Sequence, residues 1–207
     1  MLQRVLPIVL IACLVAPLAA QAQAPAGMKM RVDRSTDASD PDGNPELKVV
    51  SVGKGFRVTG GPAGVFWVPA NTATGNYTLK ATFTLMQPSN HTNYYGLIFG
   101  GSNIEGAAQA YNYFVIAQTG QFLIKGRKGD TTPNIQNRTN HAAIKVPDAK
   151  GMSVNTLEVR VAGDTVSYVV NDQVVHTMPK AGLTTDGLVG VRVNHMLDVQ
   201  IDGFEKK

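Results

Sequence analysis

The chain has 207 residues, a formal net charge of +4 and a composition that is 43% hydrophobic but only 16% charged. Its 21 glycines and 11 prolines, together with so few charges, favour short strands joined by turns over helices rich in Glu and Lys. The positive charge is spread along the chain without a block of five Lys or Arg residues, so we expect no nucleic-acid partner.

Residues 1–22 have the pattern of a signal peptide. Arg4 provides the positive start, the apolar stretch VLPIVLIACLVAPLAA follows, and AQA at 20–22 has the small residues of a cleavage site. We therefore expect cleavage after residue 22 and export to the periplasm or the extracellular space. A lipoprotein signal is the alternative, because LIAC at 10–13 fits a lipobox. The apolar stretch before Cys13 is very short for such a signal.

Cys13 is the only cysteine and lies inside this leader. The mature chain is therefore expected to have no disulfide, no thiol nucleophile and no metal site built on cysteine. No second long apolar segment follows, so we expect no membrane span. Such a protein must be stabilised by core packing, for which a domain of about 160 residues is large enough.

Residues 23–46 are polar, with clustered Pro, Gly and Asp, and are predicted to form a flexible entry segment before a β-sandwich domain at 47–207. Within the entry segment, DASDPDGN at 37–44 has the alternating carboxylates of a calcium loop but lacks the distal Glu of an EF-hand. We interpret this stretch as a solvated turn. We expect no cofactor, and calcium is the one ion that the pattern leaves open.

From Leu47 onward, short β-type runs alternate with turn residues. Thr-Gly at 119–120, Gly-Asp at 163–164 and Asn-Asp at 171–172 predict three hairpins. An irregular stretch is expected at 129–153. No helical periodicity of useful length competes, so we predict an all-β fold in which two antiparallel sheets pack as a jelly-roll sandwich. The expected strands are 47–52, 56–59, 64–69, 76–87, 94–101, 111–118, 121–128, 155–162, 165–170, 173–178, 187–195 and 197–204.

The runs at 94–101 and 111–118 are apolar on both faces, unlike a strand with one solvated face. One face of each run must meet the core, and the other carries glycine, where another group can approach closely. Two interpretations stay open: a loop at 101–110 or 129–153 covers the second face, or that face is a concave surface that binds a ligand. The two faces are Tyr95, Leu97 and Phe99 against Tyr94, Gly96, Ile98 and Gly100 in the first run, and Tyr111, Tyr113 and Val115 against Asn112, Phe114 and Ile116 in the second.

Five segments between residues 60 and 204 carry a resemblance: GPAGVFWVPANTATGNYTLKATF, YYGLIFGG, YNYFVIAQTGQFLIKGRKGD, NTLEVRVAGDTVSYVVNDQVV and DGLVGVRVNHMLDVQIDGF. They include an N-x-L-x-V strand, a Gly-Asp turn, V-N-D in place of V-N-G, and a final DGF. Their order resembles the concanavalin A-like (laminarinase and laminin G-like) jelly roll. More narrowly, it is similar to secreted bacterial proteins grouped with family 16 glycoside hydrolases or 3-keto-disaccharide hydrolase domains.

The carboxylates offer little support for catalysis. A retaining glycosidase needs two carboxylates about 5 Å apart, and an inverting one needs a wider pair. The family 16 enzymes that the chain resembles use an E-x-D-x-(x)-E cluster, which is missing here. Glu105 is the one catalytic candidate, and we interpret it as a loop residue, although Asp130 or Asp198 could meet it in the fold. If the protein is an enzyme, we expect a glycoside hydrolase.

The histidines are isolated and lack metal-ligand spacing, so we expect no metal site. His195, near Arg192 and Asn194, is either a turn residue or part of a ligand-facing polar cluster. Sugar rings stack on aromatic side chains. Each aromatic candidate could instead belong to the core, and Arg127, which shares a strand face with Lys125, could instead be solvated. The candidate ligand-binding residues are Trp67, Tyr94, Tyr95, Tyr111, Tyr113, Arg127 and His195.

These observations predict a secreted carbohydrate-binding or envelope accessory protein whose partner is a carbohydrate or cell-envelope glycan. A glycan or keto-disaccharide hydrolase of the family 16-like type is one alternative. A laminin G-like interaction domain is another. Two converging carboxylates on the concave sheet would favour the hydrolase, whereas aromatic side chains without such a pair would favour binding.

Overall fold

The computed structural model describes residues 23–33 and 46–207, so the expected signal peptide at 1–22 and the calcium-like stretch at 37–44 lie outside the described residues. The described part of the chain consists of strands and connecting turns. It contains no helix long and apolar enough to cross a membrane. The strands are β1 (Lys29–Asp33), β2 (Lys48–Val52), β3 (Gly55–Thr59), β4 (Ala63–Ala73), β5 (Tyr77–Gln87), β6 (Tyr94–Ser102), β7 (Ala110–Ala117), β8 (Gln121–Lys128), β9 (Asn134–Asn140), β10 (Ser153–Ala162), β11 (Thr165–Val170), β12 (Gln173–Pro179), β13 (Gly187–Val193) and β14 (Asp198–Lys206).

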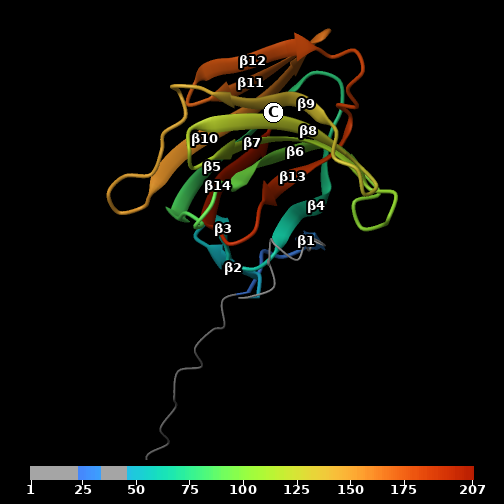
Figure 1. Ribbon diagram of the computed structural model, residues 1–207. Coiled ribbons are helices and arrows are strands. Elements are labelled where there is room, and N and C mark those ends of the chain that lie inside the picture. Colours follow the sequence, from blue (N-terminus) through green and yellow to red (C-terminus); the bar gives the residue numbers. More distant parts are fainter. Residues whose placement is uncertain (1–22, 34–45) are drawn as a thin grey trace, which may run out of the picture.

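Within the described ranges, these strands form two seven-stranded sheets with antiparallel pairing (Figure 1). Sheet A has the order β1-β4-β13-β6-β7-β8-β9, and sheet B has the order β12-β11-β10-β5-β14-β3-β2. Strands β6 to β9 follow one another as hairpins, whereas β13 returns from near the end of the chain to lie between β4 and β6. The predicted two-sheet jelly-roll sandwich is therefore confirmed.

The three hairpins predicted from turn residues are present. Gly120, between β7 and β8, has a φ of 83°, and Gly163, between β10 and β11, has a φ of 54°. Glycine adopts such positive angles without the steric cost that a side chain brings. Asn171 and Asp172, between β11 and β12, also have positive φ angles of 49° and 66°. Two consecutive residues of this kind form the tight turn whose twist matches that of the strands it joins.

The main hydrophobic core lies between the two sheets and takes one face from each. Phe83 of sheet B packs against Tyr95 of sheet A with ring centroids 5.7 Å apart. Tyr168 of sheet B packs against Phe114 of sheet A with centroids 5.2 Å apart. Tyr95 was considered as a ligand-binding residue from the sequence. It is fully buried here because its face of β6 is turned toward sheet B, so it stabilises the sandwich and lines no ligand surface.

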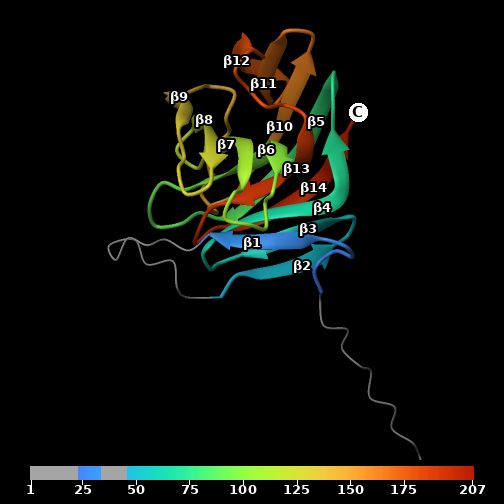
Figure 2. The same cartoon turned by 90° about the vertical axis from the view of Figure 1, so that its right-hand side faces the viewer.

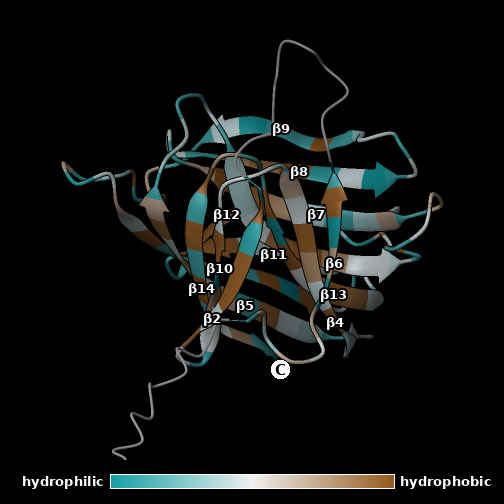
Figure 3. Ribbon diagram, turned by 90° about the horizontal axis from the view of Figure 1, so that it is seen from below, coloured by the Kyte–Doolittle hydropathy of each residue, from teal (hydrophilic) through white to brown (hydrophobic). Residues whose placement is uncertain are grey.

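The stretch 129–153, expected to be irregular, contains the edge strand β9. Its sequence NIQNRTN has one apolar residue, Ile135, and therefore lacks the alternation that identifies a half-buried strand. Figure 3 accordingly colours most of β9 as hydrophilic. Backbone pairing with β8 places this strand, for example Asn134 opposite Lys125.

Asn155, the first residue of the N-x-L-x-V motif, is fully buried and fixes the loop after β9. Its Oδ1 accepts a hydrogen bond from the backbone N of Lys145 at 2.8 Å, and its Nδ2 donates to the carbonyl O of the same residue at 2.9 Å. Asn171 donates its Nδ2 to the same Oδ1 at 2.8 Å. The motif residue therefore has a structural role, since it joins this loop to β10 and to the β11–β12 turn.

The entry segment at 23–46 contributes a strand that the sequence did not predict. β1 pairs with β4 at the other edge of sheet A, with Arg31 opposite Val65 and Asp33 opposite Ala63 (Figure 2). The five residues KMRVD do alternate between charged and apolar side chains, but so short a run inside a segment rich in Pro, Gly and Asp was not recognised as a strand. Part of the predicted flexible segment is thus packed against the sandwich, and it brings three charged side chains to sheet A.

Candidate functional site

A second apolar cluster lies on the side of sheet A that faces away from sheet B. Its members come from sheet A and from the β6–β7 loop, and they are buried. The prediction that β6 and β7 are apolar on both faces is therefore confirmed. We call this surface the aromatic face. Its buried members are Val65, Trp67, Tyr94, Ile98, Ile104, Tyr111, Tyr113, Val115, Ala117 and Leu123.

The aromatic face is covered in part by charged side chains. The guanidinium carbon of Arg192 lies 5.3 Å from the ring centroid of Tyr113, and that of Arg138 lies 5.6 Å from the ring centroid of Tyr94. Both distances permit cation–π attraction. The β6–β7 loop adds the apolar side chain of Ile104. Rings that the sequence marked as sugar-stacking candidates therefore lie beneath guanidinium groups, and a ligand would meet the cations first.

Arg192 links the groups at the centre of this face. Its Nη1 lies 2.8 Å from Oδ2 of Asp33 and donates to the hydroxyl of Tyr111 at 3.1 Å, while its Nε donates to Oδ1 of Asn194 at 3.1 Å. Burial acts to raise the pKa of Asp33, but the guanidiniums of Arg192 and Arg31 outweigh it and hold that pKa below its ordinary value. Asp33 is therefore ionised at neutral pH.

Strand β8 adds two more cations to the aromatic face. Lys125 lies opposite Tyr113 on the neighbouring strand, and Arg127 lies opposite Tyr111. The Nε of Arg127 donates to the carbonyl O of Gly129 at 2.7 Å. Burial lowers the pKa of Lys125, and the positive charges of the nearby Arg residues lower it further. The aromatic rings and the β8 cations thus form one continuous surface.

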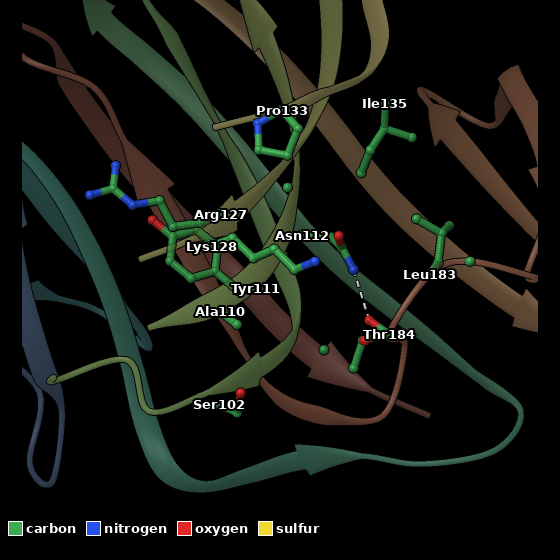
Figure 4. A pocket seen from close by; sticks show the side chains of 13 residues that line it. Ser102, Ala110, Tyr111, Asn112, Arg127, Lys128, Pro133, Ile135, Leu183 and Thr184 are labelled. Carbon is green, nitrogen blue, oxygen red and sulfur yellow. Dashed lines mark hydrogen bonds between the residues drawn. The ribbon is translucent and has the colours of Figure 1, made fainter. Parts of the chain in front are cut away.

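One hollow borders this surface, and a second lies at the end of the sandwich, on the core-facing side of β7 and β8. The first, which we call the face pocket, has a volume of about 360 Å³ and is lined by Leu123, Lys125, Asn134, Asn137 and Arg138. The second, the end pocket, has a volume of about 250 Å³ and lies where strands β6, β7 and β8 meet the segment before β13 (Figure 4). The end-pocket residues used below are Tyr111, Asn112, Gly126, Arg127 and Thr184.

The end pocket is held open by a hydrogen bond and by missing side chains. Asn112 donates its Nδ2 to the carbonyl O of Thr184 at 2.7 Å, as the dashed line in Figure 4 shows. Gly126 has no side chain, and a Cβ there would lie 3.6 Å from Cγ of Pro133, an ordinary contact distance. Larger side chains at this position would fill the hollow, so glycine keeps its volume available.

Glu105 lies on the exposed β6–β7 loop. Its Oε1 is 2.6 Å from Nζ of Lys29, and Nη1 of Arg31 lies 3.0 Å from the carbonyl O of Gly106 in the same loop. The carboxyl group is therefore paired with a cation of β1. Of the two partners considered from the sequence, Asp198 is bound to Arg57 of β3, in sheet B, and Asp130 is exposed in the β8–β9 turn.

His195 lies at the β13–β14 connection and lines neither the face pocket nor the end pocket. Its Nε2 is 2.8 Å from Nε2 of His91, and its carbonyl O accepts a hydrogen bond from Nδ2 of Asn93 at 3.0 Å. These contacts join it to the loop between β5 and β6. In the part of the chain that the structure describes, no group of three or more His, Cys, Asp or Glu side chains is placed to hold a metal ion.

The structure therefore brings together Trp67, Tyr94, Tyr111, Tyr113 and Arg127, and it separates Tyr95 and His195 from them. Sequence reasoning missed the central ion pair and Arg138. Arg192 had a detectable signal, because it is the lone charge in the apolar strand GLVGVRV. Arg138 lies in a segment without strand periodicity. Asp33 lies in KMRVD, whose alternation of charged and apolar residues was a signal that sequence reasoning overlooked.

No known family model and no curated protein sequence matches the chain. Solved structures do match. The carbohydrate binding module CBM66 from Bacillus subtilis has a TM-score of 0.60 at 10% identity, covering 78% of this chain and 92% of that one. A Bacteroides ovatus mixed-linkage glucan GH16 protein in complex with a G4G4G3G product has a TM-score of 0.57 at 9% identity, covering 90% and 97%. These likenesses show a concanavalin A-like jelly roll, as the sequence resemblance implied.

Proposed function

We propose that the protein is exported and binds carbohydrate on the aromatic face of sheet A. The observation that carries this proposal is the layer of Trp and Tyr rings, of which Tyr94 and Tyr113 lie beneath Arg side chains, with Lys125 beside them and a hollow of about 360 Å³ at its border. An apolar floor with a few polar groups that fix orientation is how small-molecule and sugar sites are generally built. The leader at 1–22 supports export.

Two structural neighbours support a carbohydrate ligand as an analogy at the level of the fold. One is by its title a carbohydrate binding module, and the other was solved with a glucan product. A fold hosts many functions, so this support is weaker than that of the site itself. The residues of the aromatic face, and not the likeness, therefore define the proposal and its test.

The carboxylates favour binding over hydrolysis. Glycosidases use one carboxyl group that keeps its proton as a general acid and a second that is ionised. Asp33 is held ionised by two guanidiniums, which suits it to pairing with cations and not to donating a proton. Glu105 is exposed and paired with Lys29. Neither carboxyl group of this face has the environment of a general acid.

The test is affinity electrophoresis of the mature protein through gels that contain soluble polysaccharides, followed by titration of the retarding polymer. We expect retardation by at least one polysaccharide. Asn137→Trp places a bulky ring in the face pocket and should remove the retardation. Asn140→Trp, an equally exposed position on the same strand outside both pockets, is the matched control and should behave as the unaltered protein.

A reducing-sugar assay on the same polymers separates binding from hydrolysis. Binding without sugar release is the expected outcome. Retardation that survives Asn137→Trp would place the ligand elsewhere. Retardation by none of a broad panel of neutral and acidic polysaccharides would remove the proposed function.

A further inference from the structure

The cations of the aromatic face differ in whether a carboxylate neutralises their charge. Arg192 is paired with Asp33. In contrast, no ion pair joins Lys125, Arg127 or Arg138 to another residue in the described part of the chain. The face therefore carries positive charge that its own carboxylates do not neutralise.

These three cations lie near one another. Lys125 and Arg127 are two residues apart on one face of β8, about 7 Å along an extended strand. Arg138, on the neighbouring strand β9, lines the face pocket together with Lys125. Burial and the positive charges of the Arg residues around it lower the pKa of Lys125. These like charges repel one another, so a bound anion would relieve the repulsion.

Building on the proposed function, we propose that the glycan bound here is acidic, with oxyanion substituents held by Lys125, Arg127 and Arg138. Guanidinium groups donate paired N–H bonds to planar oxyanions, and the ammonium group adds a compact positive charge. Uronic acid carboxylates and sulfate esters share this chemistry. A neutral glycan would cover the same cations without neutralising them, at a cost in desolvation.

A saccharide fits this face better than a nucleic acid does. The formal charge of the whole chain is only +4, without runs of Lys or Arg. The cations therefore form a local patch on the aromatic face, which suits a ligand with spaced negative charges.

The test compares polymers that differ in charge alone. Titration calorimetry of the mature protein with oligogalacturonate and with its methyl ester measures how much the carboxylate charges contribute to affinity, because the two polymers share one sugar backbone. Dextran sulfate against dextran does the same for sulfate. We expect the charged member of at least one pair to bind about tenfold or more tightly than its neutral counterpart, as charge-assisted hydrogen bonds contribute. The advantage should shrink at high ionic strength.

Variants connect the effect to the named residues. Lys125→Gln and Arg138→Gln should each weaken binding of the preferred charged polymer about tenfold. Lys125→Arg keeps the charge and should bind nearly as the unaltered protein. Lys150→Gln, at an exposed loop position outside both pockets, is the matched control and should have no effect. Thermal unfolding of each variant verifies that the fold is intact.

The possible results are distinguishable. A preference for either charged member that depends on Lys125 supports the inference, and the pair that shows it identifies carboxylate or sulfate. Equal affinity for charged and neutral members, or binding of neutral glycans alone, would overturn the inference while leaving the proposed function in place. Binding of no glycan removes both. Binding of single-stranded DNA with the same dependence on Lys125, and with greater affinity, would also overturn it.

Discussion

Arg192 on β13 donates to Asp33 on β1 across the intervening strand β4, with 2.8 Å between Nη1 and Oδ2. Both side chains are only about one-tenth exposed, at 11% and 10%. The pair connects the edge strand of sheet A to the centre of the aromatic face. It therefore couples the stability of β1 to the charge balance of the proposed glycan site.

Removing the carboxylate of this pair should destabilise the protein. In Asp33→Ala the guanidinium of Arg192 stays partly buried without its anion, and we expect the free energy of unfolding to fall by about 3 kcal/mol. Urea denaturation followed by fluorescence measures the change. Asp130→Ala, in an exposed turn of the same sheet, is the control and should change stability by less than about 0.5 kcal/mol. A loss below about 1 kcal/mol for Asp33→Ala would mean that solvent reaches Arg192 and compensates its charge.

The same pair predicts that the free energy of unfolding decreases at acidic pH. The folded-state pKa of Asp33 is held below its ordinary value, so its contribution is complete above the unfolded pKa of about 4 and is lost as the pH falls through the folded value. Glu158 of β10 adds to this loss of stability in acid. Burial opposes its ionisation, but Lys80 and Arg160 outweigh burial and lower the pKa of Glu158. These groups predict no change in stability between pH 5 and 8.

The variant Asp33→Asn tests how much Asp33 contributes to the loss of stability in acid. Unfolding free energies at pH 7 and pH 3 should differ less in the variant than in the unaltered protein, because one of the titrating groups is gone. An identical decrease in the unfolding free energy of both proteins between pH 7 and pH 3 would show that Asp33 contributes nothing to the loss of stability in acid. Glu46, an exposed carboxylate outside these ion pairs, gives the matched control variant Glu46→Gln, which should leave the decrease unchanged.

Neutralising Glu105 should affect neither binding nor stability strongly. Its ion pair with Lys29 joins two exposed side chains, and such pairs contribute about 0–1 kcal/mol. We expect Glu105→Gln to bind the preferred polysaccharide as the unaltered protein does. Lys29→Gln, which removes the cation of the same exposed pair, should also bind the polysaccharide as the unaltered protein does. Loss of a measurable sugar-cleaving activity in Glu105→Gln alone would identify Glu105 as catalytic.

The mature chain should begin at Gln23. The motivation is the AQA site at 20–22 and the short apolar stretch before Cys13. Intact-mass spectrometry of the protein exported by a bacterial host measures the terminus. As a control, Ala22→Pro at the cleavage position should block processing and leave the precursor mass. A terminus at Cys13 carrying diacylglycerol would contradict the prediction and assign the protein to a membrane surface.

Most strands of the sandwich were predictable because their local signals are strong. Alternating apolar residues identify strands with one face in the core, and the turns at Gly120, Gly163 and Asn171–Asp172 favour hairpins by their backbone preferences alone. The strands β1 and β9 escaped prediction for the opposite reason. Both are edge strands held by backbone pairing. β9 is polar throughout except for Ile135, and β1 alternates charged and apolar residues over only five positions, too short a run to stand out from its polar surroundings.

The sequence by itself determined that β6 and β7 are apolar on both faces, but it could not assign the faces. Tyr94 and Tyr95 are adjacent residues of the same type, and only the position of sheet B makes one of them core and the other part of the aromatic face. The central ion pair depends on tertiary structure in the same way. Arg192 and Asp33 are 159 residues apart, and they meet because β13 and β1 both pair with β4, a consequence of strand order that no local pattern encodes.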